Sequence, residues 1–242
     1  GKGVEFTLRD PQRLMLASFD GTPPLTGADS LVGISGAAWG RDCLYHAHSL
    51  GHGLVRTPVL AGAPEPVSTL DTARLEGDHQ WPYPLPNGQG VLFTVTYRAG
   101  TRPSDIAVVD LLTGTHRVLV QGVRAQYAAS GHLLFATANG TLMAAGFDQD
   151  RQSLTSESVP MIEELCIGPG VHYATDLAIA SSGRLMYVPL GDGADRDLQT
   201  PGWVSRDGKF EPVEPTWTLS SFLTGVLALS PDGARLTIDV SG

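Results

Sequence analysis

The chain is a succession of short apolar runs separated by turns rich in Gly, Pro, Asp and Asn. The clearest runs are residues 90–97, 105–111 and 142–148, and residues 115–120 follow a polar and apolar period of two. A period of two is typical of a β-strand with one buried face. The pattern therefore predicts an all-β protein without a helix of useful length.

One hairpin motif recurs along the sequence. Its best-preserved copy is residues 81–94, in which an aromatic lead-in and a Pro-Asn-Gly turn precede an apolar run. Degraded copies lie at residues 38–45, 127–135, 179–187 and 228–237. From turn to turn the copies are about 43 to about 52 residues apart, which is the period of propeller blades. The repeat therefore predicts a β-propeller of four-stranded antiparallel blades.

The repeat favours a single β-propeller domain over residues 1–242. Complete blades are expected at about residues 34–70, 79–121, 124–165 and 172–214, with partial blades at residues 3–25 and 224–242. Two arrangements fit. About five blades could form a ring that a shared terminal blade closes, because an open arc exposes unpaired strand edges. Alternatively, the chain is an incomplete arc of a six-bladed propeller, which would self-associate through its terminal strands.

Composition agrees with a turn-rich β protein and narrows the partners. Apolar residues make up 42% of the 242 residues and charged residues 17%, with 29 Gly and 17 Pro. A formal net charge of -9 argues against a nucleic-acid partner, because no basic stripe is present to replace phosphate counterions. No apolar run is long enough for a membrane-spanning helix, and no signal-peptide core is found. The chain begins Gly-Lys-Gly without Met, as expected of a segment of a longer protein. The missing targeting signals therefore do not indicate a cellular compartment.

The two cysteines lie in different repeats. Neither Cys43 nor Cys166 belongs to a Cys-x-x-Cys or Cys/His metal pattern. The sequence therefore favours free thiols over a disulfide.

The repeat residues resemble those of a known family. The resemblance is carried by residues 37–42, 79–88, 106–119, 130–134 and 229–233, and it covers nearly the whole chain from about residue 12. These segments resemble the TolB-like, WD-repeat-like β-propellers of bacterial proteins, which are often fused to serine/threonine kinase domains. Cys43 stands where the family pattern has Gly, and Asp10-Pro11 replaces a typical turn. The resemblance implies a module that binds a protein or peptide partner, without catalytic residues or a cofactor.

The densest polar group consists of His46, His48 and His52, with Asp78 and His79 one repeat later. Alternate strand residues face the same way, so His46 and His48 could present two imidazoles to one metal ion, with His52 as a third ligand. No Cys/His signature accompanies them, and loop histidines are commonly solvated. The five residues are therefore candidates for binding, without an assigned metal. His79 is also interpreted as a hydrogen-bonded structural histidine where its blade begins.

Catalytic and cofactor motifs are absent from the sequence. Residues 32–36 provide only a fragment of a Gly-x-Ser-x-Gly elbow, and no phosphate-binding loop occurs. Glu163–Glu164 are expected in a loop. The acidic stretch 191–197 resembles a calcium loop but lacks the Glu at the twelfth position and the flanking helices, which favours a solvated turn. We therefore expect no catalytic residue, metal or cofactor.

The four tryptophans are spaced by the repeat rather than clustered. This spacing favours packing between blades over a platform for stacking sugars or bases. They are Trp39, Trp81, Trp203 and Trp217.

The leading interpretation is a non-catalytic propeller that presents a surface for a protein or peptide, as the scaffold or sensor of a larger bacterial protein. The alternative is a propeller hydrolase or lyase, or the propeller gate of a serine peptidase. An enzyme needs carboxylates or histidines that converge on a substrate-sized pocket, whereas a scaffold needs an exposed rim with apolar and aromatic anchors.

Overall fold

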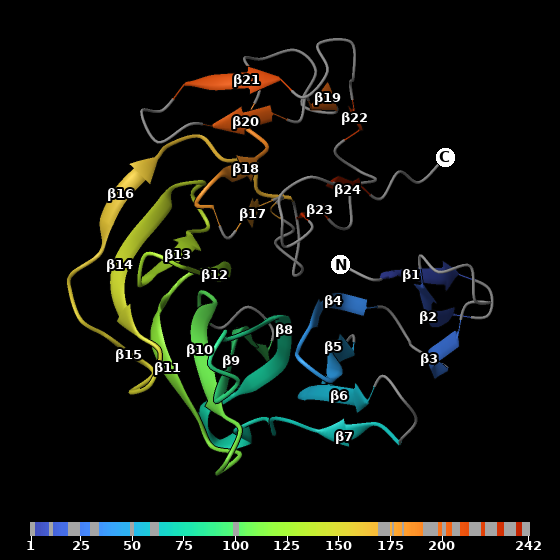
Figure 1. The fold of residues 1–242 in the computed structure, drawn as a ribbon. Helices are drawn as coiled ribbons and strands as arrows, with labels where there is room; N and C mark the ends of the chain where they lie inside the picture. Colours follow the sequence, from blue (N-terminus) through green and yellow to red (C-terminus); the bar gives the residue numbers. More distant parts are fainter. Residues whose placement is uncertain are drawn as a thin grey trace. The chain divides into compact units, whose positions relative to one another are not determined.

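The structure is a computed structural model. It describes residues 3–9, 12–18, 25–29, 34–48, 51–58, 63–98, 102–168, 175, 177–180, 182–190, 198–199, 202–204, 209–212, 219–220, 227–229 and 236–238. The chain divides into two compact units, residues Gly1–Val120 and Gln121–Gly242, called the first and second unit below. The described residues include the 3-10 turn η1 (Thr72–Arg74), and antiparallel sheets make up most of their regular structure (Figure 1). The predicted all-β class is confirmed.

The first unit contains three sheets of consecutive antiparallel strands. One sheet is formed by β1 (Gly3–Arg9), β2 (Gln12–Ser18) and β3 (Leu25–Asp29). The next is formed by β4 (Ile34–Trp39), β5 (Cys43–His48), β6 (Leu54–Pro58) and β7 (Glu65–Pro66). The third is formed by β8 (Glu76–Pro84), β9 (Gly90–Tyr97), β10 (Asp105–Asp110) and β11 (His116–Gln121). The last two have the four-stranded meander of a propeller blade.

The second unit repeats this plan. Its first sheet is formed by β12 (Arg124–Ala128), β13 (His132–Ala136), β14 (Leu142–Asp148), β15 (Ser153–Leu154) and β16 (Val159–Ile162), in which both β15 and β16 pair with β14. The next is formed by β17 (Leu177–Ile179), β18 (Leu185–Tyr187), β20 (Gly202–Val204) and β21 (Phe210–Pro212). Two further pairs are β19 (Leu198–Gln199) with β22 (Leu219–Ser220), and β23 (Leu227–Leu229) with β24 (Leu236–Ile238). The strand pairs around residues 142–148 and 228–237 lie where the repeat predicted them.

The recurrent hairpin has the same turn geometry in several blades. Gly88, Gly131 and Gly183 each follow the first strand of a sheet, with φ values of +72°, +82° and +83°. Glycine adopts positive φ without a Cβ clash, which explains its recurrence at this turn. In the best-preserved copy, the Gly88 N–H donates to the Leu85 carbonyl at 2.9 Å. The prediction that Asn87-Gly88 turns the chain is confirmed.

Two strand boundaries differ from the predicted ones. The outer strand β7 of the first repeat ends at Pro66, before the expected end of that blade at residue 70, because the N–H groups of Val67 and Ser68 both donate to the Leu54 carbonyl and end the ladder. In the next repeat, β8 begins at Glu76, before the expected start at residue 79. The second difference adds a buried acidic side chain to the blade.

The core of the first unit lies between its two four-stranded sheets. Apolar side chains of β5 and β6 pack against alternate residues of β9 and β10, among them Phe93, which is 1% exposed. Trp81 of β8 is 8% exposed, and a Cβ at Gly36 of β4 would lie 2.7 Å from its indole ring. Burial of one such side chain contributes about 1.5 to 3 kcal/mol. Trp81 therefore packs between blades, as predicted.

The second unit has a separate core. Leu134, Leu142 and Ala144 pack with Leu177 and Leu185, which joins the sheet of β12 to the sheet of β17. The ordinary alternation of strand side chains thus buries one face of each sheet against the next. The number of blades and the closure of the ring remain predictions, as does the single domain over residues 1–242.

Candidate functional site

An open groove of about 820 Å³ lies in the first unit. It is bounded by the turn that follows β4 and by the Pro-Asn-Gly turn between β8 and β9. Its lining residues are Trp39, Gly40, Arg41, Asp42, Cys43, Tyr45, Arg56, Pro58, Glu65, Pro84, Leu85, Pro86, Asn87, Gly88 and Leu111. The groove is therefore built from the same hairpin turns that define the repeat.

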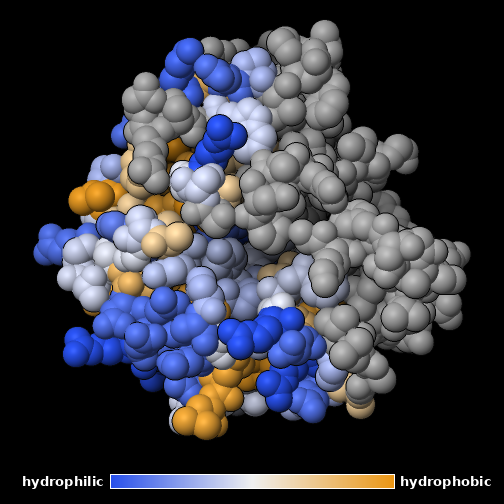
Figure 2. All heavy atoms as spheres, in the orientation of Figure 1, coloured by the Kyte–Doolittle hydropathy of each residue, from blue (hydrophilic) through white to orange (hydrophobic). Residues whose placement is uncertain are grey.

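The indole of Trp39 is 42% exposed beside this groove. Trp39 is the last residue of β4 and does not pack between blades as predicted, because its side chain is exposed at the groove. On the face drawn in Figure 2, the described residues are mainly hydrophilic, and hydrophobic residues lie in small separate groups. An exposed tryptophan at a groove provides a large apolar anchor of the kind found in interfaces.

Charged and polar groups form one wall of the groove. Arg56 donates from Nε to Glu65 Oε2 at 2.9 Å, and the two side chains are about half exposed. Burial raises the pKa of Tyr45 to about 12, with a further increase from the neighbouring Cys43 thiol. The phenol therefore stays protonated at neutral pH, and the wall is held by a paired arginine and a neutral tyrosine.

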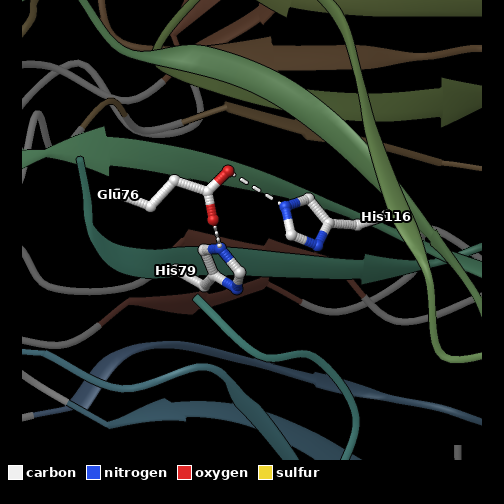
Figure 3. A group of neighbouring side chains, drawn as sticks. All are labelled: Glu76, His79 and His116. Atoms are coloured by element: carbon white, nitrogen blue, oxygen red, sulfur yellow. Dashed lines mark hydrogen bonds and ion pairs between the residues drawn. The ribbon is translucent and has the colours of Figure 1, made fainter. Parts of the chain in front are cut away.

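A second polar group lies buried in the first unit, where Glu76 contacts two histidines (Figure 3). Glu76 Oε2 lies 3.1 Å from His79 Nε2, and Glu76 Oε1 lies 3.0 Å from His116 Nε2. The side chains of Glu76 and His79 are 0% exposed, and that of His116 is 12% exposed. These three residues form the only group of three converging His, Cys, Asp or Glu side chains within the described part of the chain.

A β-bulge explains how Glu76 and His79 share a face. Residues three apart on a regular strand point to opposite faces. In β8, however, Glu76 pairs with Tyr97 and Asp78 with Thr96, so Gly77 is the extra residue of a bulge. Glu76 and His79 therefore stand opposite Tyr97 and Val95, which belong to the same core face of β9.

The electrostatics favour an ionised Glu76 and a neutral His79. Burial alone would raise the pKa of Glu76, but hydrogen bonds from His79, from the Asp71 N–H and from His116 lower it to about 2. Burial lowers the pKa of His79, against the opposing attraction of Glu76. One buried carboxylate thus accepts hydrogen bonds from two imidazoles and one backbone amide.

The second ring nitrogen of His79 also has a hydrogen-bond partner. His79 Nδ1 lies 2.7 Å from Ser68 Oγ, and that hydroxyl accepts the Leu54 N–H at 2.9 Å. The Phe93 ring packs against His79 at a centroid distance of 4.5 Å and against His116 at 5.6 Å. The two imidazoles are therefore oriented by hydrogen bonds and packed against one apolar ring.

The five residues singled out from the sequence lie in different environments. His46 is buried, with Nε2 at 3.0 Å from Thr57 Oγ1, whereas His52 is exposed and its carbonyl accepts the His79 N–H. The side chain of His48 lies outside the described residues. Asp78 is buried and accepts from the His79 N–H and from the Gln80 amide. Of the five, only His79 belongs to the converging group, and its predicted role as a hydrogen-bonded histidine is confirmed.

Of the other residues considered in the sequence, those that the structure describes belong to no such group. Glu163 and Glu164 are exposed, and Cys43 and Cys166 do not form a disulfide, as favoured. The acidic stretch 191–197 contains no residue whose side chain is described, and Trp217 also lies outside the described residues.

Sequence reasoning missed Glu76 and His116. Glu76 lay outside the expected blade, and His116 was treated as part of an ordinary outer strand. The sequence signal for pairing Glu76 with His79 was the glycine between them, Gly77, because a glycine near the start of a strand is a sign of a bulge. No signal in the sequence links that pair to His116, forty residues further along.

None of the described residues belongs to a helix with the length and hydropathy needed to cross a bilayer. No family model matches the sequence, and the search of curated proteins found no match. Structural comparison does find similar proteins, and they are β-propellers.

TolB from Acinetobacter baumannii matches with a TM-score of 0.64 and 16% identity, over 97% of this chain and 56% of TolB. A structure of a nidogen/laminin complex matches with a TM-score of 0.66 and 12% identity, over 98% of this chain and 85% of the matched chain. A puromycin-hydrolysing peptidase from Mycobacterium tuberculosis matches with a TM-score of 0.60 and 14% identity, over 98% of this chain and 38% of the peptidase. The chain thus has the fold of the TolB-like β-propellers and spans only about half the length of TolB.

Proposed function

We propose that this chain is a non-catalytic binding module that recognises a peptide segment of a partner protein at the groove beside Trp39. The exposure of Trp39 carries the proposal. A tryptophan that is 42% exposed at the edge of an 820 Å³ groove retains apolar surface that a partner side chain can cover. Aromatic residues in grooves are frequent anchors of protein interfaces.

The chemistry of the groove indicates the kind of segment it would take. Pro58, Pro84 and Pro86 line it together with Leu85. Proline rings lack N–H groups and present rigid apolar faces, so they fit an apolar or aromatic side chain better than a sugar or a nucleotide. The Arg56–Glu65 ion pair supplies both a donor and an acceptor for the peptide backbone. The solved complex with a similar fold, nidogen with laminin, supports a propeller that binds a protein partner.

A displayed library of random peptides tests the proposal. We expect peptides with an aromatic or apolar anchor to be selected, and Trp39→Ala to weaken their binding at least tenfold, measured by fluorescence titration. Phe210→Ala is the matched control, because Phe210 is 39% exposed and belongs to the second unit. Selected peptides that bind Trp39→Ala as well as the unmodified chain would contradict the proposal.

A second candidate is the propeller gate of a larger hydrolase. It is supported by the match between nearly all of this chain and 38% of a puromycin-hydrolysing peptidase. The test is hydrolysis of puromycin and of aminoacyl amides by the protein encoded in the complete reading frame, compared with this chain alone. Hydrolysis by the complete protein would favour the gate, and its absence would leave the binding module as the better proposal.

A further inference from the structure

The group of Glu76, His79 and His116 has the ligand chemistry of a transition-metal site. Two imidazole nitrogens and one carboxylate oxygen form the donor set that zinc uses in sites with three protein ligands. Calcium and magnesium prefer oxygen ligands, so the two nitrogen donors select against them. We propose that these three residues bind one Zn²⁺ ion.

The distances between the ligand atoms fit a tetrahedral ion. Ligands that lie about 2.0 to 2.1 Å from zinc in a tetrahedral site are about 3.3 Å from each other. The Glu76 oxygens lie 3.1 Å from His79 Nε2 and 3.0 Å from His116 Nε2, and all three ligand atoms lie within 4.8 Å of one another. Figure 3 shows both Nε2 atoms directed at the same carboxylate. Small side-chain shifts would place an ion between them.

The residues around the group would orient the ligands. A metal-binding histidine usually donates its second ring N–H to a neighbouring oxygen. Ser68 Oγ lies 2.7 Å from His79 Nδ1 and can accept that N–H when Nε2 faces the ion. The Asp71 N–H donates to Glu76 Oε2 at 2.7 Å and fixes the carboxylate from the other side. This support would exist before the ion binds, which reduces the ordering cost of binding.

Burial and charge also suit the ion. The Phe93 ring covers both imidazoles, so little water would compete for the metal. The carboxylate cancels one of the two positive charges of zinc, and a bound hydroxide in the fourth position would cancel the other. The side chain of His116 is 12% exposed, which makes its side of the group the route by which an ion enters.

Zinc titration of the chelator-treated chain tests the proposal. Calorimetry should show equimolar binding of Zn²⁺, and Co²⁺ in its place should give the intense visible absorption of a tetrahedral site with nitrogen ligands. His116→Ala removes the most exposed ligand and should weaken zinc affinity by at least about 100-fold, beyond the loss typical of an outer partner. His52→Ala is the matched control, because His52 is exposed and was also a candidate ligand.

Chemical protection in the unmodified chain keeps the test independent of how the variants fold. Diethyl pyrocarbonate should modify His116 in the chelated chain but not in the zinc-bound chain, while His52 and His132 stay reactive, as read by peptide mass spectrometry. Failure to bind zinc, equal losses in His52→Ala and His116→Ala, or unchanged labelling of His116 would each overturn the proposal.

Discussion

Each unit contains a buried polar side chain that needs hydrogen-bond partners, and the two units provide different partners. In the second unit, Gln126 of β12 donates to the Leu177 carbonyl at 2.7 Å and accepts the Ile179 N–H at 3.0 Å. In the first unit, Glu76 is bound by the side chains of His79 and His116. Buried polar groups must be paired in both cases.

The two groups differ in whether their hydrogen-bond partners can also bind a metal ion. The Gln126 amide pairs with backbone groups of β17 and acts as an additional rung between two sheets. A backbone N–H has no lone pair for an ion, and zinc binds Cys, His and carboxylate side chains rather than backbone carbonyls. The imidazoles around Glu76 carry lone pairs that a metal can use once their protons are redirected or released. The Gln126 group therefore links two sheets through backbone groups, whereas the Glu76 group offers side-chain donor atoms to a metal ion.

The largest expected effect is that of Glu76→Ala. Removing the carboxylate leaves two buried imidazoles and the Asp71 N–H without their acceptor, so the free energy of unfolding should fall by about 3 to 5 kcal/mol. Urea unfolding followed by circular dichroism measures the loss. Glu76→Gln retains one acceptor oxygen and should lose less. A loss below about 1 kcal/mol for Glu76→Ala would contradict the central role of this carboxylate.

Gln126→Ala should cost about 2 to 3 kcal/mol, because it leaves the buried Leu177 carbonyl and Ile179 N–H unpaired. The same urea experiment measures it, with the exposed Gln121→Ala as the control. Zinc affinity should be unchanged in Gln126→Ala. If the substitution altered zinc binding as strongly as His116→Ala does, the division of roles between the two groups would be wrong.

A pair of glycine substitutions compares the packing of the two units. Gly36 has φ of +100°, and an added Cβ would lie 2.7 Å from the Trp81 ring, so Gly36→Ala should cost about 1 to 3 kcal/mol. Gly131 has φ of +82° but no atom within 4 Å of an added Cβ. Gly131→Ala should therefore cost less, from backbone strain alone. Equal losses in thermal unfolding would show that the Trp81 contact adds nothing.

An effect confined to alkaline pH concerns two tyrosines. The pKa of Tyr45 is raised from 10 to about 12 by burial and by Cys43, and burial alone raises the pKa of Tyr187 in the second unit. The folded state holds the proton more tightly than the unfolded state, so this stability is present below pH 10 and lost between pH 10 and about 12.

The contribution of the raised Tyr45 pKa to the free energy of unfolding is on the order of 2 kcal/mol. Tyr45→Phe should flatten the decline of unfolding free energy in this pH range more than Tyr187→Phe does. Urea unfolding at a series of pH values measures the slopes. Identical slopes for Tyr45→Phe and the unmodified chain would refute the prediction.

Much of the fold could be predicted because its signals are local. A turn glycine such as Gly88 and the apolar run that follows it act within a few residues, and the strands β9 and β14 were expected at their observed positions. The end of the first blade was predicted too late, because it depends on Val67 and Ser68 reaching the Leu54 carbonyl, a contact made across the sheet. Trp39 was misassigned for the same reason, since its exposure depends on neighbouring turns.

The sequence by itself determined the all-β class, the repeat and the position of the blade hairpins, because turn and strand preferences are set by short segments. Tertiary structure alone decided which polar residues meet. His116 reaches Glu76 only when β8 to β11 form one sheet, and Glu76 joins His79 only because the bulge at Gly77 brings both to one face. Strand pairing and a single extra residue, rather than spacing along the chain, therefore created the candidate metal site.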